Sequence, residues 1–201
     1  MPLGANKAAI MGVAGVSTAD VVLLQTNTIT SGTTNTSFTS GIDSTYGEYI
    51  FRFYNLNPAT DDTTFTFQVD DDAGNNGYND FAVTSSFFRA YYDEASSGDP
   101  PPAIEYWTGN DAAQSTSYIP LAGDIGNGAD ESYVGELHLF NPASTTYVKH
   151  WYSRGHMYHS ANYASSMFPA GYINTTTAIN AINFKMGSGA FDGVIKMWGV
   201  K

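Results

Sequence analysis

Residues 48–70 read EYIFRFYNLNPATDDTTFTFQVD, two apolar-rich segments separated by an Asn-Pro-Ala-Thr break. In the second segment Phe65 and Phe67 fall on one side of an extended chain and polar residues on the other, because side chains alternate across a β-strand. The first segment, 48–56, is apolar on both sides apart from Arg52. This pattern predicts a central strand, covered by a second sheet or by a neighbouring subunit.

The same rhythm, broken by turns rich in Gly, Asn, Asp and Pro, recurs from residue 20 to the C-terminus. Helical periodicity is nearly absent. We therefore predict an all-β chain with a single domain over residues 20–201, built as an antiparallel two-sheet sandwich that is jelly-roll-like. The predicted strands cover residues 21–30, 34–40, 48–56, 63–70, 81–94, 103–109, 115–123, 133–141, 146–154, 170–175, 178–186 and 193–200.

Residues 1–19 differ from the rest, since they lack alternation and are rich in Gly and Ala. We expect an extended N-terminal arm that becomes ordered on assembly. Two later segments, 53–67 and 137–151, share the order strand, Asn-Pro-Ala-Thr/Ser, strand. We interpret each as a β-hairpin, because proline sets φ in the turn and Asn can hydrogen-bond its own backbone. Internal duplication is the alternative explanation of the likeness.

The composition excludes several classes of function. With a net charge of -11 and only 8 Lys and Arg residues, the chain lacks the basic stripe that nucleic-acid binding requires. It has no cysteine, so disulfides and thiolate chemistry are excluded. No run approaches the roughly 18 apolar residues of a membrane span. We expect a soluble protein that binds neither nucleic acid nor membrane.

The stretch YVKHWYSRGHMYH, residues 147–159, holds three of the four histidines. Parity places His150 with Tyr152 on one face of a strand that ends near residue 154, and Lys149 with Trp151 on the other face. His156 and His159 would then lie in the following loop, where zinc would need a third ligand from elsewhere. No H-E-x-x-H pattern is present. We predict a structural or surface role and assign no metal site or catalytic role to these histidines.

An acidic stretch, VDDDAGNNGYND at 69–80, is the candidate calcium loop. It is not an EF-hand, because Asn75 replaces the glycine at the sixth position and Phe81 the glutamate at the twelfth. A loop site of another kind for a hard cation and a solvated hairpin tip both remain open. The candidate ligands are Asp70, Asp71, Asp72 and Asn75.

No segment matches a template for nucleophilic catalysis or for phosphate or dinucleotide binding, so we predict a non-enzymatic protein without a cofactor. Tyr and Trp are suited to glycan stacking and protein interfaces, because they bury a large area at little cost in rotamer entropy. A place in the core or on the sheet surface is the alternative for each of them. The glycan or interface candidates are Tyr91, Tyr92, Tyr106, Trp107, Tyr158 and Tyr163.

Two stretches carry a resemblance to a known family: SGIDSTYGEYIFRFYNL at 40–56 and GYINTTTAINAINFKMGSGAFDGVIKMWGVK at 171–201. They resemble small virion structural proteins of tailed bacteriophages, which often end in two strands joined by Ser-Gly-x-Phe-x-x-Gly and close on an aromatic-Gly pair. Trp198-Gly199 stands where Tyr-Gly is more usual in that family. The residues of the matching hairpin are Gly187, Ser188, Gly189, Phe191 and Gly193.

The resemblance implies a jelly-roll-like virion protein and carries over no catalytic residue. We expect a protein on the virion exterior that contacts other virion proteins and forms homo-oligomers, either an outer capsid decoration or cement-like protein, or a compact tail accessory. The alternative is a lectin-like module that binds host surface glycans, with calcium at residues 70–80. A glycan-cleaving enzyme is the third possibility.

Overall fold

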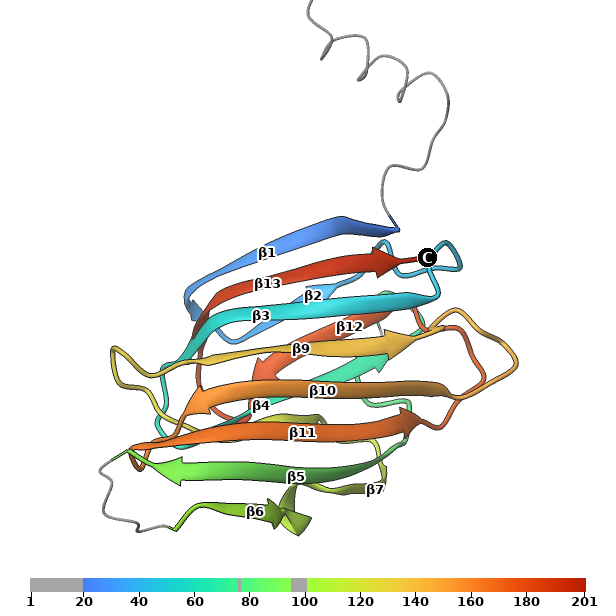
Figure 1. Cartoon of the computed structure of the whole chain (residues 1–201). Coiled ribbons are helices and arrows are strands. Elements are labelled where there is room, and N and C mark those ends of the chain that lie inside the picture. Colours follow the sequence, from blue (N-terminus) through green and yellow to red (C-terminus); the bar gives the residue numbers. More distant parts are fainter. Residues whose placement is uncertain (1–19, 76, 95–100) are drawn as a thin grey trace, which may run out of the picture.

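The computed structural model describes residues 20–75, 77–94 and 101–201 (Figure 1), so the predicted arm lies outside the described residues. No helix in this part of the chain is long and apolar enough to cross a membrane. Over these residues the chain forms one short 3-10 helix, η1 (Thr108–Asn110), and the strands β1 (Val21–Thr33), β2 (Asn35–Phe38), β3 (Glu48–Pro58), β4 (Thr63–Asp70), β5 (Val83–Asp93), β6 (Ala103–Tyr106), β7 (Ala112–Ser115), β8 (Ile119–Ile125), β9 (Tyr133–Phe140), β10 (Lys149–Tyr158), β11 (Tyr163–Ile173), β12 (Ala181–Met186) and β13 (Phe191–Val200).

The strands form two antiparallel sheets that stack on each other (Figure 1). The large sheet has the order β1-β13-β3-β9-β10-β11-β5-β6, with β7 also paired to β5, and the small sheet has the order β2-β12-β4-β8. The predicted all-β sandwich is therefore confirmed, and β3 is central in the large sheet as residues 48–56 predicted. β3 lies between β13 and β9.

The winding of the chain is jelly-roll-like. The first four strands of the large sheet are β1, β13, β3 and β9, and the small sheet follows with β2, β12, β4 and β8 in the same order. Each strand of the small sheet is thus the chain neighbour of the strand at the same position in the large sheet. Adjacent antiparallel strands cross together from one sheet to the other, and this wraps both sheets around one core.

Two predicted hairpins are wrong for this reason. Residues 53–67 connect β3 to β4, which lie in different sheets, and the Ser-Gly stretch at 187–190 connects β12 to β13 in the same way. The two crossings lie side by side, with hydrogen bonds from Ala59 N to Ala190 O (2.8 Å) and from Gly187 N to Thr64 O (2.7 Å). The other Asn-Pro-Ala segment, 137–151, is a hairpin as predicted, since β9 pairs with β10.

β11 begins at Tyr163, seven residues before the predicted strand at 170. The prediction missed the first half of β11 because that half is followed by Pro169. Proline within a run argues against a strand, since it cannot donate to the ladder. Pro169 faces Phe87 in the ladder with β5, whereas the register between β10 and β11 has a gap there, between Tyr152↔Ala170 and Gly155↔Met167. The missing N–H is accommodated by interrupting one of the two ladders.

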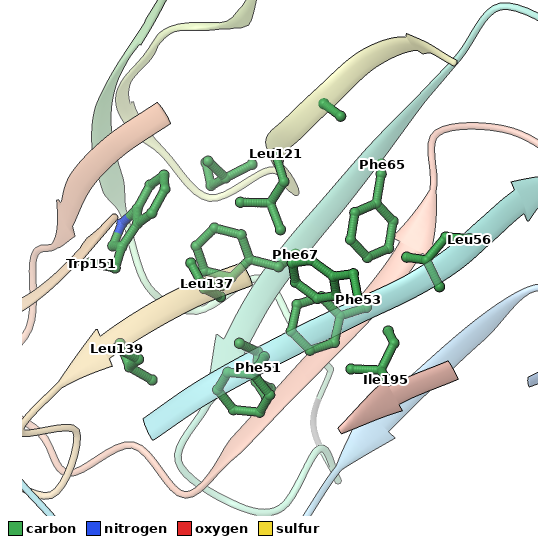
Figure 2. Packing of buried hydrophobic residues seen from close by; sticks show 14 of the residues in the cluster. Phe51, Phe53, Leu56, Phe65, Phe67, Leu121, Leu137, Leu139, Trp151 and Ile195 are labelled. Carbon is green, nitrogen blue, oxygen red and sulfur yellow. The ribbon is translucent and has the colours of Figure 1, made fainter. Parts of the chain in front are cut away.

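Aromatic side chains from both sheets fill the space between them (Figure 2). Phe184 of β12 is central, because its ring lies 5.4 Å from the rings of Phe51 and Phe53 on β3 and 5.8 Å from Phe65 on β4. All four side chains are buried. The parity predicted for β4 is confirmed, with Phe65, like Phe67, on the inner face.

Replacing Phe184 with Ala is expected to lower the free energy of unfolding by about 3–5 kcal/mol, because it leaves a cavity among aromatic rings from both sheets. Urea denaturation followed by tryptophan fluorescence measures this loss. Phe88→Ala is the matched control, since that side chain is 43% exposed and lies outside the core. A loss below about 1 kcal/mol for Phe184→Ala would show that this ring does not hold the sheets together.

Gly193 allows a bulge in β13, where the register with β3 shifts between Asp192 and Val194. Its φ is 130°, and a Cβ there would lie 2.7 Å from the carbonyl oxygen of Asn55. Gly193→Ala should therefore cost about 1–3 kcal/mol of stability, measured by thermal and urea unfolding. Gly32→Ala separates the strain of a positive φ from the steric contact of the new Cβ. Gly32 has a φ of 95° but nothing within 4 Å of its Cβ position. Equal losses in the two variants would contradict a steric contribution at Gly193.

Candidate functional site: the outer face of the large sheet

The outer face is the surface of the large sheet that points away from the small sheet. Most of the exposed large hydrophobic side chains of the described residues belong to strands of this sheet, and Tyr147 alone lies outside its strands. They lie on this face because their chain neighbours, such as Phe87 beside Phe88, point into the core. The outer-face group comprises Val21, Leu23, Tyr54, Phe88, Tyr92, Ile104, Tyr106, Val134 and Tyr152.

A row of charged residues crosses the middle of the outer face. The register places Lys196, Arg52, Glu136 and Arg154 opposite one another on β13, β3, β9 and β10. Arg154 Nη2 lies 3.0 Å and Arg52 Nε lies 3.7 Å from the Glu136 carboxylate. The row therefore carries more positive than negative charge, on a chain whose net charge is -11.

Beside this row an imidazole stacks on a phenol ring. The rings of His138 and Tyr152 lie 4.5 Å apart, and His138 Nδ1 is 2.5 Å from Glu48 Oε1. Burial raises the pKa of Tyr152, and the carboxylates of Glu48 and Glu136 add to the effect. The ring of Tyr152 is thus held in place on the outer face as a neutral phenol at ordinary pH.

Two hollows lie on the outer face. A shallow groove runs over the paired Gly135 and Gly155, where a Cβ on Gly155 would lie 2.2 Å from Tyr133 Oη, so the glycines make room for that buried ring. The second hollow, the Tyr92–Tyr158 cleft, has a volume of about 420 Å³. It is lined by Tyr92, Asp93, Glu94, His156, Met157, Tyr158 and Ala164.

The three clustered histidines do not converge. β10 extends to Tyr158, so His156 lies on the strand and the predicted loop position is wrong. His150 and His156 both point outward, and six residues of strand separate them by about 20 Å. His159 is buried instead, stacked on Tyr163 at 3.8 Å, with its Nε2 3.3 Å from Asp124 Oδ2. Among the described residues no histidine belongs to a cluster of possible metal ligands.

The structure separates the six aromatic candidates. Tyr92 and Tyr106 are exposed, and Tyr91 and Tyr158 are half-buried. Trp107 and Tyr163 face the interior: Trp107 packs against Phe87, while Tyr163 is 8% exposed. Of the six, Tyr92 and Tyr158 meet in the Tyr92–Tyr158 cleft, and the rings of Tyr91 and Tyr163 lie 5.5 Å apart.

The candidate calcium residues also divide. Asp70 and Asp71 lie together, and they are joined by Asp80, which the sequence pattern did not select. Asn75 makes a turn with Asp72, donating from its backbone N to Asp72 Oδ1 (2.8 Å) and from its side chain to Asp72 O (2.5 Å).

Sequence reasoning missed an ionic cluster behind the far end of the large sheet. Arg89 Nε lies 2.8 Å from Glu105 Oε2, and its guanidinium stacks 3.9 Å from the Trp107 ring. Its Nη1 is 3.4 Å from Asp124, the residue that also meets His159. These residues are far apart in the chain, so no local pattern indicated the cluster, which links β5, β6 and β8.

Lys149 is also buried, on the inner face of β10 where parity had placed it beside Trp151. Its Nζ donates to the carbonyl oxygens of Ser144 (2.6 Å), Tyr147 (3.1 Å) and Thr175 (3.2 Å). Burial lowers the pKa of Lys149. The three N–H donors of this ammonium group thus have three acceptors. Its role is structural, because it joins the loop before β10 to the loop after β11.

Comparison of the chain with protein families, with curated proteins and with solved structures found no match.

The Tyr92–Tyr158 cleft gives a pH-dependent prediction. The Tyr158 hydroxyl donates a hydrogen bond to the Glu94 carboxylate, and this raises the pKa of Tyr158 to about 12. Ionisation would break the bond and place a phenolate beside a carboxylate. Glu94→Gln should therefore move the pKa of Tyr158 down towards its ordinary value of 10.0. The Tyr158 ring shifts in NMR spectra between pH ~9 and ~12 measure the change.

Glu48→Gln is the control for this titration, because Glu48 pairs with His138 and not with Tyr158. It should leave the Tyr158 titration unchanged. An identical Tyr158 pKa in the wild type and in Glu94→Gln would contradict the assigned hydrogen bond.

Proposed function

We propose that this chain is a non-enzymatic structural protein of a tailed-phage virion, an outer decoration protein of the head or a compact tail accessory. It would work by binding neighbouring virion subunits through its outer face. The observation that carries the proposal is the concentration of exposed aromatic and aliphatic side chains on that one face, which also carries the charged row. Tyr, Phe and Arg are enriched in protein interfaces.

Charge indicates the kind of partner. Arg52, Arg154 and Lys196 are three of the eight Lys and Arg residues of the chain, and all three lie in the charged row of the outer face. An acidic surface on a neighbouring subunit would complement this row. The rest of the molecule is acidic and would repel that same acidic surface. The resemblance of residues 40–56 and 171–201 to virion proteins of tailed phages, together with the jelly-roll-like winding, supports the same assignment.

A test begins with particles of the phage that encodes the chain, examined by mass spectrometry and by immunogold labelling. We expect the protein in purified particles, with label on the exterior. Its absence from the particles would overturn the proposal.

The double variant Phe88→Glu, Tyr152→Glu places two carboxylates on the outer face and should reduce attachment to particles lacking the protein by at least about tenfold, since buried unpaired charges are costly at an interface. Tyr147→Glu is the matched control, because Tyr147 is 73% exposed but lies outside the large sheet. Circular dichroism checks that each variant is folded. Equal attachment of both variants would exclude the outer face as the binding surface.

A lectin-like module is the second candidate, favoured by the Tyr92–Tyr158 cleft. Aromatic rings with a carboxylate and an imidazole at the rim are suited to stacking and hydrogen bonding with a sugar. A glycan array separates the two functions. Binding that is lost in Tyr92→Ala and kept in Phe88→Glu would favour the lectin, and a blank array would leave the virion contact role as the supported one.

A further inference from the structure

The end of β4 and the loop that follows it bring three carboxylates together. One ligand oxygen from each of Asp70, Asp71 and Asp80 lies within 4.8 Å of the other two. Asp70 is the last residue of β4 and is 0% exposed, Asp71 is half-buried and Asp80 is exposed. The cluster therefore extends from the sheet interior to the surface, with one side open to solvent.

Asp70 has a second feature that indicates a ligand, apart from the clustering of the carboxylates. Its Oδ1 accepts a hydrogen bond from Asp71 N at 2.8 Å, but its Oδ2 is enclosed and has no hydrogen-bond partner. Within the described part of the chain it is the one carboxylate oxygen in this condition. A buried charged oxygen without a partner costs free energy, so a ligand that neutralises it would be held firmly.

The surrounding backbone is fixed before any ligand arrives. Asn180, just before β12, clamps the loop: its Nδ2 donates to Asp71 O (2.6 Å), its Oδ1 accepts from Ala73 N (2.9 Å), and its N donates to Asp70 O (3.0 Å). Ala73 and Gly74 both have positive φ and make the turn. Asp70 and Asp71 are thus held in position by a residue that directly precedes another strand of the small sheet.

The local charge is strongly negative. Asp70, Asp71 and Asp80 each contribute a carboxyl group, and Asp72 adds another in the same loop. The Tyr78 hydroxyl, in the same loop, is another enclosed polar atom without a hydrogen-bond partner. Carboxylates that gather around a common point provide the electrostatic condition for binding a cation.

We infer that Asp70, Asp71 and Asp80 bind a calcium ion. Three carboxylates are hard oxygen ligands, which suit calcium or magnesium and not zinc or copper. Calcium fits better, because it accepts six to eight oxygens in irregular geometry, and the open side of the cluster leaves room for water. Bound there, the ion would join the end of β4 to the loop before β5. This inference does not depend on what the outer face binds.

The test compares thermal unfolding of the whole chain in EDTA and in calcium chloride, for the wild type and for Asp70→Asn. Calcium at about 100 times its Kd should raise the wild-type Tm by about 5–10 °C. Asp70→Asn removes the buried charge at nearly constant shape, so it should fold in EDTA with a Tm at or above that of the wild type, and calcium should not shift it. Asp130→Asn, an exposed aspartate outside the cluster, should respond as the wild type does.

A second readout uses terbium as a calcium substitute. Tyr78 lies in the same loop, so excitation of tyrosine should sensitise terbium emission in the wild type and in Asp130→Asn, but not in Asp70→Asn. Identical wild-type Tm values in EDTA and calcium would overturn the inference. An equal Tm shift from magnesium at the same concentration would overturn the assignment to calcium.

Discussion

The packing of aromatic rings between the two sheets is the constraint on which the other features depend. Phe184 of the small sheet lies within 6.2 Å of four aromatic rings, from Phe38, Phe51, Phe53 and Phe65. Two stacked sheets are about 10 Å apart, so rings of this size must interdigitate and leave little freedom of register. Because a shift by one residue would turn every ring outward, the inner face also decides which side chains the outer face displays. The exposure of Tyr54 and Tyr152 follows from the burial of Phe53 and Trp151.

The four strands of the small sheet correspond to only four strands of the large sheet. The inner side of the remaining strands must therefore be covered by other groups. There the chain adds polar groups with specific partners to buried hydrophobic side chains such as Phe87 and Met167. Arg89 is stacked on Trp107 and paired with Glu105 and Asp124, and His159 meets the same aspartate. Such clusters fix geometry because each buried polar atom is costly if its partner moves. They hold β8 against the far strands of the large sheet.

Side-chain parity could be predicted from the sequence, since it depends only on the two-residue period of a strand. The alternation placed Phe65 and Phe67 in the core and Lys149 beside Trp151, as the structure has them. The pairing of strands could not be predicted in this way. Two nearly identical Asn-Pro-Ala segments make a crossing at Pro58 and a hairpin at Pro142, because the choice depends on which sheet holds the next strand, a long-range property. The prediction of β11 failed at Pro169 for a related reason. A proline is tolerated within a strand where just one neighbouring ladder is interrupted, and this too depends on long-range pairing.

In the acidic loop, likewise, the composition could be read from the sequence, but the burial of its side chains could not. The density of Asp and Asn at 69–80 left a hard-cation loop and a solvated hairpin tip both open, and the pattern alone chose Asn75 and omitted Asp80. What distinguishes a binding loop from a solvated turn is the burial of one carboxylate, and burial comes from the fold. Asp70 is enclosed because it ends a core strand whose backbone is clamped by Asn180, 110 residues later in the chain. The jelly-roll-like winding brings β4 beside β12, and thereby leaves one carboxylate oxygen of the acidic turn enclosed, rigidly held and without a hydrogen-bond partner.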